Sequence, residues 1–205
     1  MLITISRQYG AGGSAVAQLV AESLGWSLVD NELIDEVARR AGMPAEQVAD
    51  REERVPSFGE RLARALVASP EVPLVIPAAI ENLDEAGLVK VTEAVVAEIA
   101  QQGKVVLVGR AAVAVLARFP GALHVRLVAP KPFRVRILMG RLNVDEKAAT
   151  KALDDTDAQR ARYHKEYYQR DWTDPASYHM VLNTEALGFD GAAELIEARA
   201  RALGW

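Results

Sequence analysis

The chain has 205 residues, of which 50% are hydrophobic and 25% charged, enough for one α/β domain with a sizeable core. A net charge of −4 at pH 7 argues against a general nucleic-acid binder, and the absence of cysteine excludes disulfides, zinc–thiolate sites and a cysteine nucleophile. No secretory signal is evident and no apolar run approaches membrane-spanning length, so a soluble, cytoplasmic protein is expected.

Strands and helices are predicted to alternate along the first half of the chain. The hydrophobic pattern predicts a strand at residues 2–5, a helix at 14–24, a strand at 26–30 and a helix at 31–42. Residues 43–89 are less regular, charged at first and then rich in proline, which is typical of an insertion that closes over a ligand.

The second half continues the alternation. It predicts a helix at 92–102, a buried strand at 104–110, a strand at 122–130, a helix at 131–142, a long polar helix at 145–169, a strand at 178–184 and a closing helix at 190–203. Repeated strand–helix units indicate a parallel sheet that is covered by helices on both faces.

The segment "ISRQYGAGGS" joins the first strand to the first helix and is typical of a phosphate-binding loop. Such a loop points successive backbone N–H groups into one cavity, and the following helix adds its positive end. Against the pattern G-x-x-x-x-G-K-[ST], two positions match and two differ. The residues predicted to contact phosphate are Gly10, Ala11, Gly12, Gly13 and Ser14. A purely structural turn explains the glycines equally well.

The lysine of that pattern is replaced by Gly13, and its first glycine by Arg7. Phosphoryl transfer depends on positive charge near the transferred group, so another cation must supply it. Arg7 is the local candidate, although an arginine here could also be simply solvated. Ser14 keeps the hydroxyl that would bind Mg²⁺.

Further along, the segments "LVDNELIDEVARRAG", "VVLVGRAA", "VAPKPFRVR", "DDTDAQRARYHKEYY" and "DWTDPASYHMVLNT" occur in a characteristic order. With the loop, they make nearly the whole chain resemble the cytidylate kinase-like family, whose members commonly carry a glycine in place of the loop lysine. The resemblance implies one P-loop kinase-like domain over residues 1–205, with a parallel sheet between helices. It also implies a small helical insertion at about 33–89 that binds a nucleoside monophosphate, and a short lid at about 134–150.

The implied activity is transfer of phosphate from MgATP to CMP or dCMP. ATP, Mg²⁺ and a nucleoside monophosphate are then the expected cofactors and partners, with no nucleic acid and no membrane. The residues that match the family's acceptor site are Arg110 and the pair Asp157 and Arg160, which share a helix face. An arginine fork suits phosphate, and a carboxylate can accept from the cytosine amino group.

Three arginines of "FRVRILMGR" match the family's lid, which closes over the ATP phosphates. Arg134 and Arg141 join Arg7 as predicted catalytic cations, and Arg136 is predicted to bind phosphate. Asp30 falls where the acceptor region begins, although it would serve equally as a helix cap. Structural alternatives remain for the others: a strand-end ion pair for Arg110, an exposed ion pair for Asp157 with Arg160, and solvated charges in the lid.

The chain departs from cytidylate kinases at Gly13, Ala111 and Leu153, all at positions predicted to face phosphate or substrate. These departures keep two other functions open. One is a non-catalytic nucleotide-binding or regulatory protein. The other is a P-loop kinase for a different small acceptor, since one fold serves many acceptors.

Overall fold

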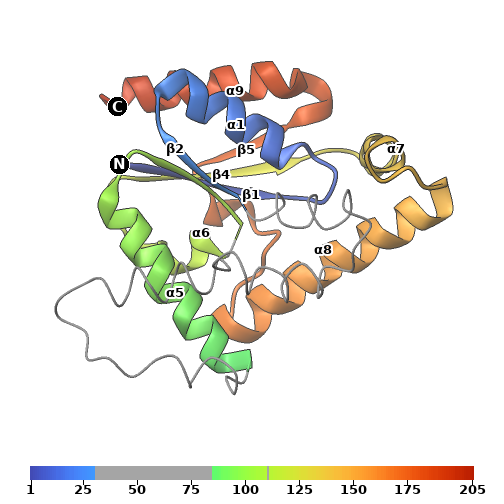
Figure 1. Cartoon of the computed structure of the whole chain (residues 1–205), viewed down its shortest axis with the longest axis horizontal. Coiled ribbons are helices and arrows are strands. Elements are labelled where there is room, and N and C mark those ends of the chain that lie inside the picture. Colours follow the sequence, from blue (N-terminus) through green and yellow to red (C-terminus); the bar gives the residue numbers. More distant parts are fainter. Residues whose placement is uncertain (31–84, 110) are drawn as a thin grey trace, which may run out of the picture. The chain divides into compact units, whose positions relative to one another are not determined.

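The structure is a computed structural model that describes residues 1–30, 85–109 and 111–205 (Figure 1). The chain divides into two compact units, one made of Met1–Asp30 and Val96–Trp205, the other of Asn31–Val95. The helix predicted at 31–42, most of the insertion predicted at about 33–89, and Arg110 lie outside the described residues.

The larger unit is built on a parallel sheet, as the sequence predicted. Its strands are β1 (Leu2–Arg7), β2 (Ser27–Asp30), β3 (Val105–Val108), β4 (Ala122–Val128) and β5 (Met180–Asn183). The order across the sheet is β2-β3-β1-β4-β5, and every neighbouring pair is parallel. All carboxyl ends therefore meet at one edge, where ligands of open α/β sheets bind.

Helices follow most strands. They are α1 (Gly13–Leu24), α5 (Glu85–Gln102), α6 (Ala112–Val115), α7 (Lys131–Leu142), α8 (Glu146–Tyr168) and α9 (Thr184–Ala202), with a 3₁₀ turn, η2, at Pro175–Ser177. None of the helices among the described residues is long and apolar enough to cross a membrane.

Two helix starts were predicted wrongly. The helix expected from residue 92 begins at Glu85, and the closing helix expected from residue 190 begins at Thr184. The closing helix starts early because the Asn183 side chain accepts hydrogen bonds from two N–H groups of its first turn. Gly188, with φ 69°, then kinks the helix, and this break obscures the periodicity in the sequence.

The sheet is covered on both faces, which confirms the predicted sandwich (Figure 1). Ile3 and Ile5 of β1 point toward the face where α1 and α9 pack, whereas Leu2 points to the face of α6 and the end of α5. Side chains alternate between faces along a strand, so Thr4 and Ser6 share the second face with Leu2. Both residues are buried there.

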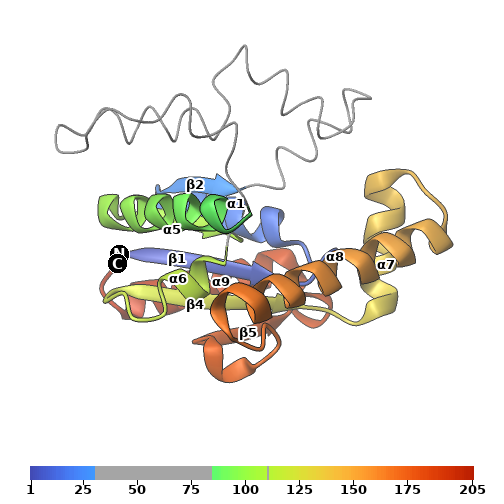
Figure 2. The same cartoon turned by 90° about the horizontal axis from the view of Figure 1, so that it is seen from below.

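Helix α7 lies beyond the end of the sheet to which β1 and β4 point, and α8 begins there and runs back past the sheet (Figure 2). They pack against each other through Val135, Leu138, Ala149 and Leu153, with Tyr9 at the edge of this cluster. Leu153 is 1% exposed. Leu153, one of the positions at which the chain differs from cytidylate kinases, is thus part of the core between the two helices.

The lid predicted at about 134–150 coincides with the end of α7 and the start of α8. Only residues 143–145 separate the two helices. Asn143 ends α7 in a left-handed conformation, and the Asp145 side chain caps α8 by accepting from the Ala148 N–H. Closure of this region over a nucleotide stays a prediction.

Candidate functional site

The glycine-rich loop, residues 7–14, leaves the end of the central strand β1 and enters α1. Gly10 and Gly12 have φ of 82° and 77°, a left-handed backbone that favours glycine. The Ala11 N–H donates to the Gln8 carbonyl, which closes the turn. The first turn of α1 presents N–H groups without intrahelical partners, so the loop has the elements of an anion-binding helix N-terminus.

Two residues of α9, the helix that follows the last strand, hold this loop, and the sequence analysis missed both. The Thr184 hydroxyl donates to the Ala11 carbonyl at 3.0 Å. A Cβ atom at Gly12 would collide with the Phe189 ring, so the ring packs on the bare backbone. The "NT" at the end of the last strand was the available signal for Thr184, because the ends of parallel strands meet at the same edge.

The Arg7 side chain fills the space into which a side chain at position 13 would project. A Cβ atom added at Gly13 would lie 2.6 Å from Arg7 Cγ and 3.1 Å from Arg7 Cβ and Cδ. The arginine side chain therefore crosses the site from which the lysine of the standard pattern would emerge. Arg7 is only 8% exposed, so the reading of it as a solvated surface charge is wrong.

The Arg7 guanidinium extends toward the ends of the neighbouring strands. A Cβ atom at Gly109, directly after β3, would collide with Arg7 Nη1. Asp30 ends β2 and is paired in register with Val108, the residue before that glycine. The structure thus brings Arg7, Gly109 and Asp30 to the carboxyl edge where acceptor binding was predicted.

Tyr9, in the loop, is held through its backbone by α7 and α8. Its N–H donates to Asp157 Oδ1 at 2.8 Å, and its carbonyl accepts from Arg134 Nη1 at 3.2 Å. Arg134 and Asp157 also pair directly, with Nη1 and Oδ2 2.6 Å apart, and Arg134 Nε donates to the Ala129 carbonyl. Two residues predicted for different substrates therefore form one partly buried ion pair that fastens the loop to both helices.

The Tyr9 ring lies between two more predicted site residues. The guanidinium carbons of Arg141 and Arg160 are 4.8 and 5.6 Å from the ring centroid, within the range of cation–π attraction. Arg160 Nη1 also donates to the Arg7 carbonyl at 2.8 Å. The structure thus brings Arg134, Arg141 and Arg160 to the start of the loop, where Arg7 also lies.

Arg136 has a different environment. It is exposed on α7, and its guanidinium stacks over the Phe133 ring at 5.4 Å. That ring meets Phe189 edge-on, with centroids 6.5 Å apart. Arg136 is therefore connected to the loop through Phe133 and Phe189, of which Phe189 packs on Gly12.

The site offers little protein-based metal ligation. Among the described residues, no group of three or more histidine, aspartate or glutamate side chains could hold a metal ion. Ser14 is half-buried in the first turn of α1. A hydroxyl oxygen suits Mg²⁺, which commonly takes only one or two protein ligands beside phosphates and water, so Ser14 fits the predicted role.

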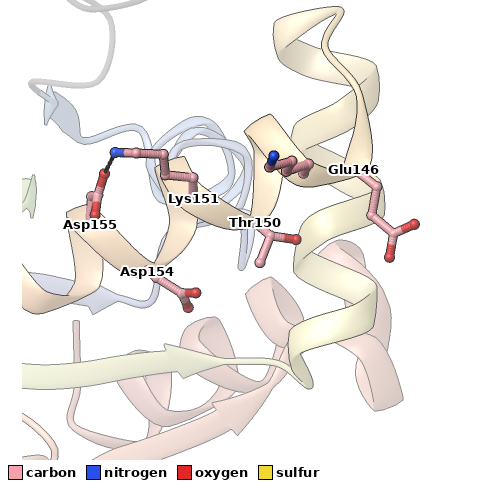
Figure 3. Close-up of a pocket in the computed structure, with 6 residues that line it drawn as sticks. Glu146, Thr150, Lys151, Asp154 and Asp155 are labelled. Carbon is pink, nitrogen blue, oxygen red and sulfur yellow. Dashed lines mark hydrogen bonds and ion pairs between the residues drawn. The ribbon is translucent and has the colours of Figure 1, made fainter.

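A hollow of about 700 Å³ lies elsewhere, along the outer side of α8 (Figure 3). Its lining is Glu146, Lys147, Thr150, Lys151, Asp154 and Asp155. Lys151 pairs with Asp155 across the lining at 2.5 Å, and Asp154 pairs with Lys131 of α7 at 2.7 Å. None of the predicted site residues lines this hollow, and three of its charged residues are already in ion pairs, so we do not place the site there.

Comparison with known proteins agrees with this geometry. The chain is 25% identical over 201 residues to a cytidylate kinase of Methanocaldococcus jannaschii, which covers 97% of this chain and 96% of that protein. Among solved structures, an uncharacterized protein from Eubacterium ventriosum has a TM-score of 0.68 with 23% identity, and a shikimate kinase from Bacteroides thetaiotaomicron 0.52 with 13%. Both alignments cover 98% of each chain, and they show a shared P-loop kinase fold.

The strand order, the glycine-rich loop at the end of β1 and the clustered arginines are thus found in a chain with a kinase fold. The profile of the cytidylate kinase-like family matches residues 2–186, nearly the whole chain. The chain belongs to the cytidylate kinase-like family.

Proposed function

We propose that this protein is an ATP-dependent nucleoside-monophosphate kinase that phosphorylates CMP or dCMP to the diphosphate. Family membership and the kinase fold support phosphotransfer to a nucleotide. The observation that carries the proposal is the packing of Arg7 against Gly13. A buried arginine in the space of the missing lysine keeps a positive charge at the loop, and phosphoryl transfer needs such a charge.

The proposal gives the other predicted site residues the following roles. Backbone N–H groups at the start of α1 bind phosphate oxygens, and Ser14 binds the Mg²⁺ that accompanies ATP. Arg141 and Arg136 add positive charge from α7. Arg110 and Arg160 hold the acceptor phosphate, as the family resemblance implies, and bidentate arginine contacts suit that group.

A second function is supported by the pair between Arg134 and Asp157. Both Asp157 oxygens are engaged, one by Arg134 and the other by the Tyr9 N–H. If these contacts persist with nucleotide bound, both residues serve to hold the loop rather than to bind ATP or cytosine, which favours a protein that binds nucleotide without turnover. A kinase for another small acceptor is the third possibility. The cytoplasmic location expected from the sequence stays a prediction.

The deciding experiment is ADP release from MgATP with CMP, dCMP, UMP, AMP or GMP as acceptor. We expect turnover with CMP or dCMP, and a loss of about 10²–10³-fold in kcat for Arg7→Ala, the size seen when one charge-stabilising donor is removed. Arg7→Lys restores a cation and should recover part of the rate. Arg201→Gln, on the exposed side of α9, is the matched control and should keep the full rate.

The outcomes separate the three functions. No turnover with any monophosphate, from folded protein that binds ATP in calorimetry, supports the binding-only function or another acceptor, and a screen of small hydroxyl-bearing acceptors then distinguishes these two. Turnover that is unchanged in Arg7→Ala would refute the role given to Arg7 while leaving the kinase activity standing.

A further inference from the structure

Tyr9 lies where the glycine-rich loop meets both α7 and α8, and its backbone is fixed on each side. Its N–H donates to Asp157 Oδ1 of α8 at 2.8 Å, and its carbonyl accepts from Arg134 Nη1 of α7 at 3.2 Å. The preceding residue, Gln8, is tied to the end of β4, because its side-chain oxygen accepts from the Ala129 N–H at 3.1 Å. The half-buried ring of Tyr9 therefore projects from a main chain that hydrogen bonds hold in place.

The Tyr9 ring contacts one arginine of each helix. The guanidinium carbons of Arg141, on α7, and Arg160, on α8, lie 4.8 and 5.6 Å from the ring centroid. An aromatic ring attracts a cation over its face within about 6 Å of its centroid, so both distances are short enough. Arg160 is also held from a second side, since its Nη1 donates to the Arg7 carbonyl at 2.8 Å. One side chain of the loop thus meets two cations that come from different helices.

Such a ring assists two guanidinium groups at one place for two physical reasons. Like charges repel each other, and the electron-rich face of the ring lowers the cost of keeping both cations at the loop. An arginine side chain also loses rotamer freedom when it is fixed, so one that is already held in place loses less when a phosphate binds. A ring on a fixed backbone therefore provides both attraction and preorganisation.

Apolar packing alone does not require an aromatic ring at this position. Tyr9 also lies at the edge of the apolar cluster between α7 and α8, beside Met139 and Leu142. A leucine would fill that role, but it has no π face for a cation. The contacts described above use the backbone and the ring of Tyr9 and not its hydroxyl, so phenylalanine should serve as well as tyrosine.

We propose that Tyr9 is a positioning residue whose ring holds Arg141 and Arg160 at the loop, the first for the phosphates of ATP and the second for the phosphate of the acceptor. The inference rests on the proposed kinase function and extends it, because it links the two substrates through one side chain. Tyr9 acts through the two arginines rather than on a substrate. Weakening the attraction of its ring for cations should therefore impair the use of both substrates.

The test varies the electron density of the ring while its shape stays nearly constant. Position 9 of the full chain carries phenylalanine or its mono-, di- or trifluorinated form, because fluorine withdraws electrons from the ring face with little change in volume. With phenylalanine, kcat/KM for MgATP and for CMP should stay near the wild-type value, and it should fall stepwise with each added fluorine. Tyr9→Leu, which has no ring, should lose about 5- to 30-fold for both substrates, the combined effect of two cation–π contacts near the surface.

The matched control is the same fluorinated series at Phe119. This residue is also half-buried and packs against a core cluster, and it lies just before β4, at the end of the sheet away from the loop. Its series should leave kcat/KM unchanged. Four results would each overturn the role of Tyr9: values that do not depend on fluorine at position 9, wild-type values in Tyr9→Leu, a loss confined to one substrate, or an equal fall in the Phe119 series.

Equilibrium binding separates this inference from the proposed function. If the wild-type protein shows no turnover of MgATP with CMP, the proposed activity fails, and dissociation constants for MgATP and CMP from calorimetry then replace kcat/KM in the same series. A stepwise loss of affinity for both ligands would support the role of Tyr9 in the absence of catalysis. Affinities that do not depend on fluorine, or no binding of either ligand by the wild-type protein, would overturn it.

Discussion

The close packing of Gly13 against Arg7 predicts that the two positions are energetically coupled. Gly13→Ala would place a Cβ atom 2.6 Å from Arg7 Cγ, much closer than carbon atoms normally approach. Adding a carbon to a well-packed region costs about 1–3 kcal/mol. At a compatible helical position without such a neighbour, the same change stabilises by about 0.4–1 kcal/mol.

Arg7→Ala removes the Cγ and Cδ atoms that meet the new carbon. Gly13→Ala should therefore be destabilising with Arg7 present and much less so, or stabilising, in the Arg7→Ala background. The expected coupling free energy is about 1–3 kcal/mol, well above the limit of about 0.5 kcal/mol for independent sites.

The assay is urea unfolding of the wild-type protein, both single variants and the double variant. Two optical probes must give coincident transitions, because the chain contains two compact units. Gly140→Ala on α7 is the matched control, since a Cβ atom there would meet nothing within 4 Å. It should stabilise equally in both backgrounds. A coupling below about 0.5 kcal/mol between Gly13 and Arg7 would refute the packing argument.

Three further predictions concern stability. Asp157→Asn should lower the free energy of unfolding in urea by about 3 kcal/mol, because it leaves the buried Arg134 without its counter-charge. Asp155→Asn, in an exposed ion pair, should cost less than about 0.5 kcal/mol. Equal costs for the two variants would contradict this argument. Asp145→Ala should lose about 1 kcal/mol with the α8 cap, and an unchanged urea midpoint would show that the cap contributes nothing. Burial lowers the pKa of His124 and His164 from 6.5 to about 4. Between pH 6.5 and 4 the unfolded state therefore binds more protons than the folded state. The contribution of these two neutral histidines to the free energy of unfolding is complete above pH 6.5 and is lost as the pH falls toward 4. The melting temperature should therefore fall between pH 6.5 and 4, and it should fall less steeply in His164→Gln. An equally steep fall in that variant would be inconsistent with the role given to His164.

Local patterns in the sequence predicted most of the fold. The buried run of β3 and the helix–glycine boundary at Gly25 were read from hydrophobic periodicity and glycine alone. The alternation of these elements then predicted the parallel sheet and its two covered faces, because parallel strands need helical crossovers. The starts of α5 and α9 were wrong by several residues, since caps and kinks that set such boundaries carry little periodic signal.

The sequence located the loop, whereas the chemistry assigned to its residues stays a prediction. The pattern correctly placed a glycine-rich turn between the first strand and the first helix, and it marked Arg7 as the arginine nearest the missing lysine. The sequence could not indicate that Arg7 is buried against Gly13, because that contact depends on where the strand ends and the helix begins in space. Nor could a spacing rule pair Arg134 with Asp157, which lie on different helices.

The sequence by itself therefore determined the fold class, the loop and the family resemblance, all of which rest on short-range patterns and their order. Only the tertiary structure decided which charged side chains meet. The buried hydrogen-bonded cluster of Ser6, Arg126, Trp172 and Tyr178 shows the reason most clearly, because its members come from three separate parts of the chain. Side chains so far apart in sequence become neighbours only through the parallel register of β1 and β4 and the return of the chain past α8.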